Sequence, residues 1–283
     1  MPGSAGVVLA GGRSSRMGTP KAALEWHGST LLRRTVGILA RATGGPVVVV
    51  RAKDQELPEL PAYVQLIDDP REGKGPVQGL AAGLAALEGR AETAFVSSTD
   101  MPFLHPAFVR RVLRAVQEGA DVGLPVARGY PQPLAAAYKT SLAPLAERLV
   151  KEERLRPAFL FEQCAVARLD EAALKDDPVL AALDPGLDSV VNVNEPDDYR
   201  TARNKPAPPV TIQRFGVLAS GPDGRREPET VRAATVAEAA AAAGVDFGHH
   251  VTAALNGDQI TRDGQTPLAA GDTVFFLSAD AGG

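Results

Sequence analysis

The sequence contains a single cysteine, Cys164, among its 283 residues. One cysteine cannot form a disulfide within the chain, so no oxidised crosslink is expected to stabilise the fold. The residues around it, 161–166, are largely apolar. We therefore interpret Cys164 as a small buried hydrophobic residue rather than as a nucleophile.

The sequence also lacks a long apolar run and a large excess of charge of one sign. No stretch approaches the roughly 20 apolar residues of a membrane span, and the short apolar segment 6–10 lacks the basic start of a signal peptide. The formal net charge is −4, which gives no support for a nucleic-acid or anionic-membrane partner. We therefore expect a cytoplasmic protein that binds any polyanionic ligand in a local pocket.

The first two thirds of the chain alternate short apolar runs with helical patterns, as doubly wound α/β domains do. Several runs are continuously apolar, which favours strands buried on both faces of a largely parallel sheet. One helix is expected to begin at Pro106 and to end near Gly119. The predicted strands are residues 6–10, 47–50, 64–67, 93–98, 122–125, 133–138 and 165–169.

The last third of the chain has a different texture, so the sequence predicts two domains, residues 1–203 and 210–283. A proline-rich linker, 204–209, separates them. Beyond it, Thr235 and Glu238 form a capping box at the start of an alanine-rich helix. The expected strands around that helix indicate a small β-rich domain; they are residues 210–218, 252–255 and 273–277.

A loop rich in glycine and basic residues follows the first predicted strand. Glycines at a strand end allow the backbone to approach phosphates, and cationic side chains neutralise phosphate charge. The spacing matches neither a Walker A loop nor the Rossmann fingerprint. We predict a triphosphate-binding loop that includes Leu9, Ala10, Gly11, Gly12, Arg16 and Lys21.

Asp100 follows the predicted strand 93–98 and precedes Pro102. A carboxylate at a strand end near a triphosphate loop suits Mg²⁺, which takes one or two carboxylates together with phosphate oxygens. A turn or helix-capping role is the alternative for this aspartate. Asp69, followed by Pro70, has two interpretations as well, as a hydrogen-bond acceptor for a nucleobase or as the start of a turn.

The loop and three later segments together resemble the molybdenum cofactor guanylyltransferase (MobA) family and its sugar-nucleotidyltransferase relatives. The three segments are Asp68-Asp69-Pro70 with Gly75-Pro76-Val77-Gln78-Gly79, then Ser98-Thr99-Asp100-Met101-Pro102, and finally Asn192-Val193-Asn194-Glu195-Pro196. The resemblance covers residues 6 to 203 and implies a Rossmann-like nucleotidyltransferase fold. It also implies GMP transfer from GTP to molybdopterin, with Mg²⁺ held by Asp100.

The resemblance assigns roles to individual residues. Arg16, Lys21 and Asp100 would be catalytic, and Asn192 and Asn194 would contact the acceptor or order the site, with turn formation as the alternative. The nucleotide would be bound by Leu9, Ala10, Gly11, Gly12, Lys21, Arg51, Asp69, Gly75 and Asp100.

Two positions depart from the family pattern. Thr99 replaces a frequent cysteine, and Arg51 replaces a base-contacting asparagine. An arginine can still donate to a base carbonyl, and a CTP-using relative stays open as an alternative.

The chain printed here ends in Gly282-Gly283 after a strand-like run. Residues 210–283, and above all 268–276, resemble the MoaD and ThiS sulfur carriers, which have a β-grasp, ubiquitin-like fold. The resemblance implies that Gly283 is adenylated and converted to a thiocarboxylate. Its implied partners are an adenylating enzyme and the large subunit of molybdopterin synthase.

Carriers of this kind supply sulfur for molybdopterin, and MobA-like enzymes add a nucleotide to the finished cofactor. Two steps of one pathway on one chain favour the molybdenum cofactor over thiamine or sugar metabolism. The alternatives are a cytidylyltransferase of the same pathway, a nucleotidyltransferase for another phosphorylated acceptor, and a chain whose working part is the carrier.

Overall fold

The computed structural model describes residues 3–11, 20–70, 75–219 and 227–278. The chain divides into two compact units, of which the first comprises residues 1–24 and 30–199 and the second residues 25–29 and 200–283. Within the second unit, Arg203 Nε donates to Glu25 Oε2 at 2.8 Å.

The first unit is built on an eight-stranded sheet with the order β10-β7-β9-β6-β1-β4-β5, and β8 pairs with β7. Only β9 runs antiparallel to its neighbours in that path. The strands are β1 (Ser4–Leu9), β4 (Val47–Arg51), β5 (Val64–Asp68), β6 (Thr93–Ser98), β7 (Val122–Ala127), β8 (Tyr130–Pro131), β9 (Ala135–Lys139) and β10 (Val166–Leu169).

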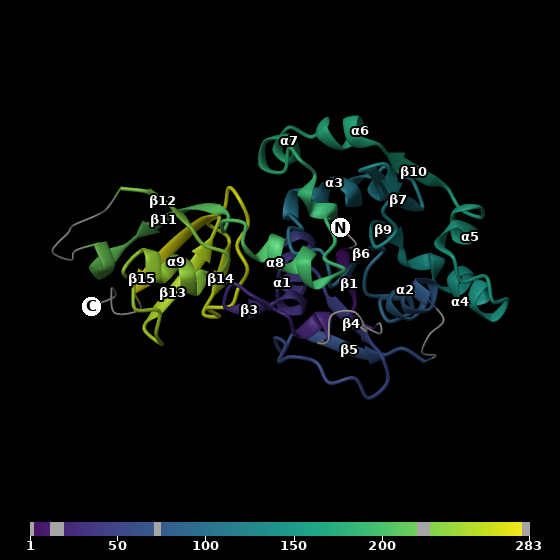
Figure 1. Ribbon diagram of the computed structural model, residues 1–283, viewed down its shortest axis with the longest axis horizontal. Coiled ribbons are helices and arrows are strands. Elements are labelled where there is room, and N and C mark those ends of the chain that lie inside the picture. Colours follow the sequence, from purple (N-terminus) through teal and green to yellow (C-terminus); the bar gives the residue numbers. More distant parts are fainter. Residues whose placement is uncertain (1–2, 12–19, 71–74, 220–226, 279–283) are drawn as a thin grey trace. The chain divides into compact units, whose positions relative to one another are not determined.

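Helices cover both faces of this sheet (Figure 1). Helices α1 and α3 pack together on one face, and α2 packs with α4 on the other. The α-helices of this part of the chain are α1 (Leu31–Thr43), α2 (Gly75–Ala85), α3 (Pro106–Gln117), α4 (Ala143–Lys151), α5 (Pro157–Phe161), α6 (Glu171–Lys175), α7 (Pro178–Leu183) and α8 (Pro196–Arg203). Short 3₁₀ turns are η1 (Lys21–Ala23), η2 (Thr140–Leu142) and η3 (Asp188–Val190), and β2 (Glu25–Trp26) pairs with β3 (Ser29–Thr30).

The predicted doubly wound α/β class is confirmed for this unit, and each of its predicted strands forms within two residues of the expected bounds. Burial on both faces holds for β1, β4 and β6. Strand β5, at the edge of the sheet, is less covered, and its Leu66 is 44% exposed. An edge strand has a neighbour on one side only, so fewer side chains are covered.

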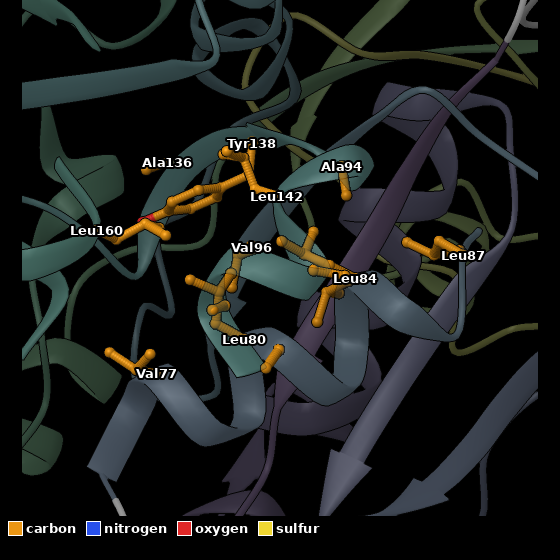
Figure 2. Close-up of a cluster of buried hydrophobic side chains, with 14 of the residues drawn as sticks. Val77, Leu80, Leu84, Leu87, Ala94, Val96, Ala136, Tyr138, Leu142 and Leu160 are labelled. Atoms are coloured by element: carbon orange, nitrogen blue, oxygen red, sulfur yellow. The ribbon is translucent and has the colours of Figure 1, made fainter. Parts of the chain in front are cut away.

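The core between the sheet and α2 is filled by aliphatic side chains (Figure 2). Helix α2 contributes Val77, Leu80 and Leu84, and Leu87 lies just beyond its end. The sheet contributes Val96 and Tyr138, among others. Close approach of α2 to β1 depends on glycine, because a Cβ at Gly83 would lie 2.4 Å from Val7 Cγ1. The tight contact fixes β1, whose carboxyl end leads into the predicted phosphate loop.

The second unit contains a five-stranded sheet with the order β12-β11-β15-β13-β14, in which β11 and β15 pair in parallel at the centre. Its elements are β11 (Pro209–Arg214), η4 (Gly216–Ala219), β12 (Glu229–Arg232), α9 (Val236–Ala242), β13 (Val251–Leu255), β14 (Gln259–Thr261) and β15 (Thr273–Ser278). One face of the sheet packs on α9 through a separate apolar core. The prediction of a β-rich unit with one helix is confirmed.

The predicted N-cap of α9, Thr235, is confirmed, while Glu238 reaches back to the residue before the N-cap. Thr235 Oγ1 accepts from the Glu238 N–H at 3.3 Å, and Glu238 Oε2 accepts from the Ala234 N–H at 2.8 Å. The strand predicted over residues 210–218 is wrong beyond Arg214. Gly216 adopts a left-handed φ of 61°, which ends the extended chain and starts η4.

Within the part of the chain that the structure describes, no helix is long and apolar enough to cross a membrane.

Replacing Gly83 with alanine is expected to destabilise the first unit. The new Cβ overlaps Val7 on a rigid strand, which costs about 1–3 kcal/mol and outweighs the roughly 1 kcal/mol that alanine gains in a helix. Denaturant unfolding of Gly83→Ala measures the loss. The double variant Gly83→Ala/Val7→Ala removes the overlap, so adding Gly83→Ala to Val7→Ala should cost no further stability. A double variant that is clearly less stable than Val7→Ala alone would contradict this account of the contact.

Candidate active site

Three side chains that the sequence singled out meet at the carboxyl edge of the first sheet. Lys21 Nζ donates to Asp100 Oδ2 at 3.0 Å and to Asn194 Oδ1 at 2.9 Å. Lys21 lies in η1, Asp100 follows β6, and Asn194 precedes α8. The Lys21 and Asp100 side chains are 19% and 17% exposed, so both are largely shielded yet reachable by a ligand.

The turn that carries Asp100 is held by several hydrogen bonds. Ser98 Oγ donates to Asp100 Oδ1, and the Asp100 carbonyl accepts from the Val193 N–H at 2.9 Å. Arg34, which is buried in α1, donates from Nε to the Pro102 carbonyl at 2.5 Å. These bonds fix the carboxylate before any ligand arrives, which lowers the entropic cost of binding.

Asn194 is positioned by a carboxylate at the start of α8. Asp198 Oδ2 accepts from the backbone N–H groups of Asn194 at 3.1 Å and Glu195 at 3.0 Å. The N–H groups at the start of a helix have no carbonyl partner in the helix itself, so an acidic side chain that accepts from them stabilises the helix start. Asn192, the other predicted acceptor residue, is exposed on the same segment.

The first residues of the predicted phosphate loop are braced by Gln55, which the sequence analysis missed. Gln55 Nε2 donates to the Ala10 carbonyl at 3.0 Å, and its Oε1 accepts from the Ala52 N–H at 2.9 Å. A Cβ at Gly11 would lie 3.2 Å from the Ala52 nitrogen, so a larger residue crowds the neighbouring strand end. Leu9 closes β1 directly before this pair. Gly12 and Arg16 lie outside the described residues.

Arg51 lies at the end of β4 and is held in place. Its Nε donates to Asp68 Oδ1 at 2.8 Å, and its Nη1 donates to the Gln55 carbonyl at 3.1 Å. The Asp69 N–H bonds to the Arg51 carbonyl at 2.6 Å, which places Asp69 beside Arg51. Gly75 starts α2 with a left-handed φ of 72°, the conformation that favours glycine.

Among the described residues, no group of three or more His, Cys, Asp or Glu side chains could hold a metal ion. A single carboxylate at a strand end still fits Mg²⁺, which takes most of its remaining ligands from water and substrate phosphates. Asp100 is such a carboxylate, and its present partners, Lys21 and Ser98, are hydrogen-bond donors that a cation can replace.

Cys164 is half-buried rather than buried, and its Sγ donates to the Leu160 carbonyl at 3.3 Å. Burial raises the pKa of the thiol to about 11, and the charge of Asp121 adds to the effect. The thiol is therefore protonated near neutral pH, which supports the interpretation that it is not a nucleophile.

Several residues that order the site escaped the sequence analysis. Asp198 carries a signal that could have found it, since an acidic residue in the first turn of a helix favours capping. Gln55 and Arg34 act through contacts with distant segments, as does the bond of Asp68 to Arg51, and no local pattern marks such contacts.

Comparisons with known proteins identify the family of the chain. The family model described as MobA-like NTP transferase domain matches residues 6–169. A probable molybdenum cofactor guanylyltransferase of Opitutus terrae is 35% identical over 205 residues, which is 72% of this chain and 96% of the relative. One of Mycobacterium tuberculosis is 44% identical over 150 residues, which is 52% of this chain and 73% of the relative.

Solved structures show the same fold. Molybdopterin-guanine dinucleotide biosynthesis protein A of Archaeoglobus fulgidus superposes with a TM-score of 0.56 at 24% identity, over 70% of this chain and 96% of that one. The bifunctional IspDF of Campylobacter jejuni gives a TM-score of 0.53 at 13% identity, over 70% of this chain and 53% of that one. The match of the family model over more than half of the chain, together with these relatives, shows that the chain is a nucleotidyltransferase and belongs to the MobA-like NTP transferase family.

Proposed function

We propose that this chain transfers GMP from GTP to molybdopterin and so forms a guanine dinucleotide cofactor. The observation that carries the proposal is the contact of Lys21 Nζ with Asp100 and Asn194 at one edge of the sheet. Open α/β sheets bind ligands at this edge. The names of the relatives supply the guanine nucleotide and the molybdenum cofactor.

The reaction is the attack of the terminal phosphate of molybdopterin on the α-phosphorus of GTP, with pyrophosphate as the leaving group. Such a transfer needs positioning and charge neutralisation more than it needs a protein base. Lys21 is a cation on a long side chain beside Asp100, and we propose that it turns from that carboxylate to the phosphates of the nucleotide. Arg16 is proposed as a second cation on the basis of the sequence.

Asp100 would hold Mg²⁺, which when bound supplies positive charge to the phosphate oxygens. The contact of Lys21 with Asp100 supports this arrangement, because the ammonium group and a cation held by the carboxylate would both lie close to the reacting phosphates. Asn194, at the other side of the ammonium group, would face the acceptor phosphate, and Asn192 would lie next to the acceptor on the same segment.

The choice of nucleobase is proposed to involve Arg51 and Asp69. Guanine presents the O6 and N7 acceptors that arginine recognises, and its N1–H and exocyclic amino group suit a carboxylate. Asp68 holds the Arg51 guanidinium at one side, which supports a fixed donor at this strand end. A CTP-using enzyme of the same pathway is the alternative, since an arginine can also donate to the cytosine carbonyl.

We propose that residues 210–283 form a β-grasp sulfur carrier, joined by residues 204–209 to the transferase domain, residues 1–203. The support is the order of the five strands, with the first and last side by side and parallel and one helix after the second strand. An adenylating enzyme and the large subunit of molybdopterin synthase would then act on Gly283. This residue and its neighbours from 279 onward lie outside the described residues.

Two other functions stay open as alternatives. A transferase for another phosphorylated acceptor would use the same cluster of Lys21, Asp100 and Asn194. A chain that works as a carrier alone would not need that cluster, and the fixed Asp100 turn supports a working transferase instead.

Lys21→Ala and Asp100→Asn are each expected to lower kcat for GMP transfer about 100- to 1000-fold, the loss typical when one group that stabilises the transition-state charge is removed. Product formation from GTP, Mg²⁺ and molybdopterin measures the effect. Exposed residues of the same types provide controls, Lys151→Ala and Asp176→Asn, which should keep full activity. Full activity in the Lys21 or Asp100 variant would contradict the proposed mechanism.

The carrier assignment predicts a covalent change at Gly283. Incubation with ATP, an adenylating enzyme and a sulfur donor should replace one oxygen of the terminal carboxylate by sulfur, and intact-mass measurement detects the gain. Deleting Gly282 and Gly283 should abolish the change while GMP transfer continues. An unchanged mass in the intact chain, with the adenylating enzyme active on a known carrier, would rule out the assignment.

A further inference from the structure

A short hairpin of the first unit has an unusual backbone. Strands β7 and β8 pair through Ala127 and Tyr130, so Arg128 and Gly129 are the two central residues of the turn. Both have positive φ values, 55° and 82°, as a type I′ turn requires. Arginine is not among the residues that adopt this conformation readily, so the turn carries a backbone cost of about 1–3 kcal/mol.

Hydrogen bonds hold the hairpin in place. Arg128 Nη2 donates to Asp188 Oδ1 at 2.6 Å and to the Gly186 carbonyl at 3.1 Å. The Arg128 N–H donates to Glu171 Oε1 at 2.9 Å. Gln132 Nε2 donates to the carbonyls of Ala127 at 3.2 Å and Tyr130 at 3.3 Å. The backbone that carries Tyr130 is therefore fixed from several sides.

The ring of Tyr130 nevertheless stands in solvent, since the residue is 72% exposed. A rigid aromatic side chain with a polar tip provides a large contact area at a low entropic cost, which suits recognition of a ligand. A strained, braced turn that presents an uncovered aromatic ring is better explained by a bound ligand than by the stability of the fold.

Strand register places the hairpin at the same edge as Asp100. Strand β9 pairs Ala135 with Ser97 of β6, and the Leu134 carbonyl accepts from the Ser98 N–H at 3.2 Å. The residues before Leu134 therefore extend past the end of β6. Strand β7 is two positions from β6 in the sheet, which corresponds to about 10 Å at the usual strand spacing.

Residues 188–194 connect the hairpin with the candidate active site. At its start, Asp188 accepts from Arg128, and at its end, Asn194 accepts from Lys21. In between, the Val193 N–H bonds to the Asp100 carbonyl. Asn192, which precedes Val193, belongs to the same segment and is exposed.

We propose that Tyr130 forms the subsite for a flat heteroaromatic ring of the phosphorylated acceptor. The ring of the acceptor stacks on Tyr130, while its phosphate reaches Lys21 and Asn194 about two strands away. Arg128 is a positioning residue, because its guanidinium is already bonded to Asp188 and Gly186. The inference rests on the proposed function and adds the residue that recognises the ring.

The test compares Tyr130→Ser with Tyr130→Phe in the full chain. Loss of one stacking contact is worth about 1–3 kcal/mol, so Tyr130→Ser should raise KM for molybdopterin about tenfold or more. The value of kcat and the affinity for GTP should stay unchanged, and Tyr130→Phe should restore KM. Tyr63→Ser is the matched control, since Tyr63 is 56% exposed and lies before β5, at the opposite edge of the sheet.

A binding measurement gives a second readout that needs no turnover. Fluorescence titration with a pterin that carries a phosphate ester on its side chain should show the same loss in Tyr130→Ser and the same recovery in Tyr130→Phe. An unchanged KM and pterin affinity in Tyr130→Ser would overturn the subsite. A change of oligomeric state in this variant, without a change in KM, would overturn it as well.

The outcome for the proposed function is separate, because it is measured on the unsubstituted chain. GMP transfer by that chain with no effect of Tyr130→Ser means that the function holds and the subsite is wrong. No GMP transfer, combined with tight pterin binding that depends on Tyr130, means that the subsite holds and the nucleotide or acceptor differs. No pterin binding by the unsubstituted chain contradicts the subsite.

Discussion

The first unit must bring one ammonium group into contact with both a carboxylate and an amide, and the rest of its structure serves to hold these three groups together. Lys21, Asp100 and Asn194 come from widely separated parts of the sequence, and the Lys21 Nζ lies within 3.0 Å of both partners. A cation shared in this way is well placed to exchange partners, since a phosphate oxygen can replace a carboxylate oxygen. The three side chains are therefore already brought together, and under the proposed function a triphosphate would displace existing contacts.

The sheet makes this contact attainable. Parallel strands β1, β4 and β6 end at one edge, so the residues after each strand gather there. Tight packing fixes the position of β1 in the sheet, because α2 lies so close to Val7 that Gly83 has no space for a Cβ. Polar contacts then fix the turns above it, through Gln55 at Ala10, Arg34 at Pro102 and Asp198 at Asn194. Packing places the strand ends, and hydrogen bonds place the side chains.

Much of the fold could be predicted because the patterns are local. Apolar runs located the strands of the first sheet, and Thr235 with Glu238 located α9. Short elements such as β12 and β14 were missed, since a few residues carry too little periodicity. At the site, Lys21, Asp100 and Asn194 could be named from motifs, but the Asp68 contact of Arg51 and the bracing by Gln55 depend on register between strands. The hairpin at Arg128 was missed because arginine gives no signal for a left-handed turn.

The measurement that tests the central claim most directly is product analysis with the nucleotides in parallel. The purified chain is incubated with molybdopterin, Mg²⁺ and either GTP or CTP, and the dinucleotide product is identified by mass. The account predicts a guanine dinucleotide from GTP and no product from CTP, with Arg51, which Asp68 holds, as the proposed donor to the base. A cytosine dinucleotide alone, or no product while both nucleotides bind, would contradict it.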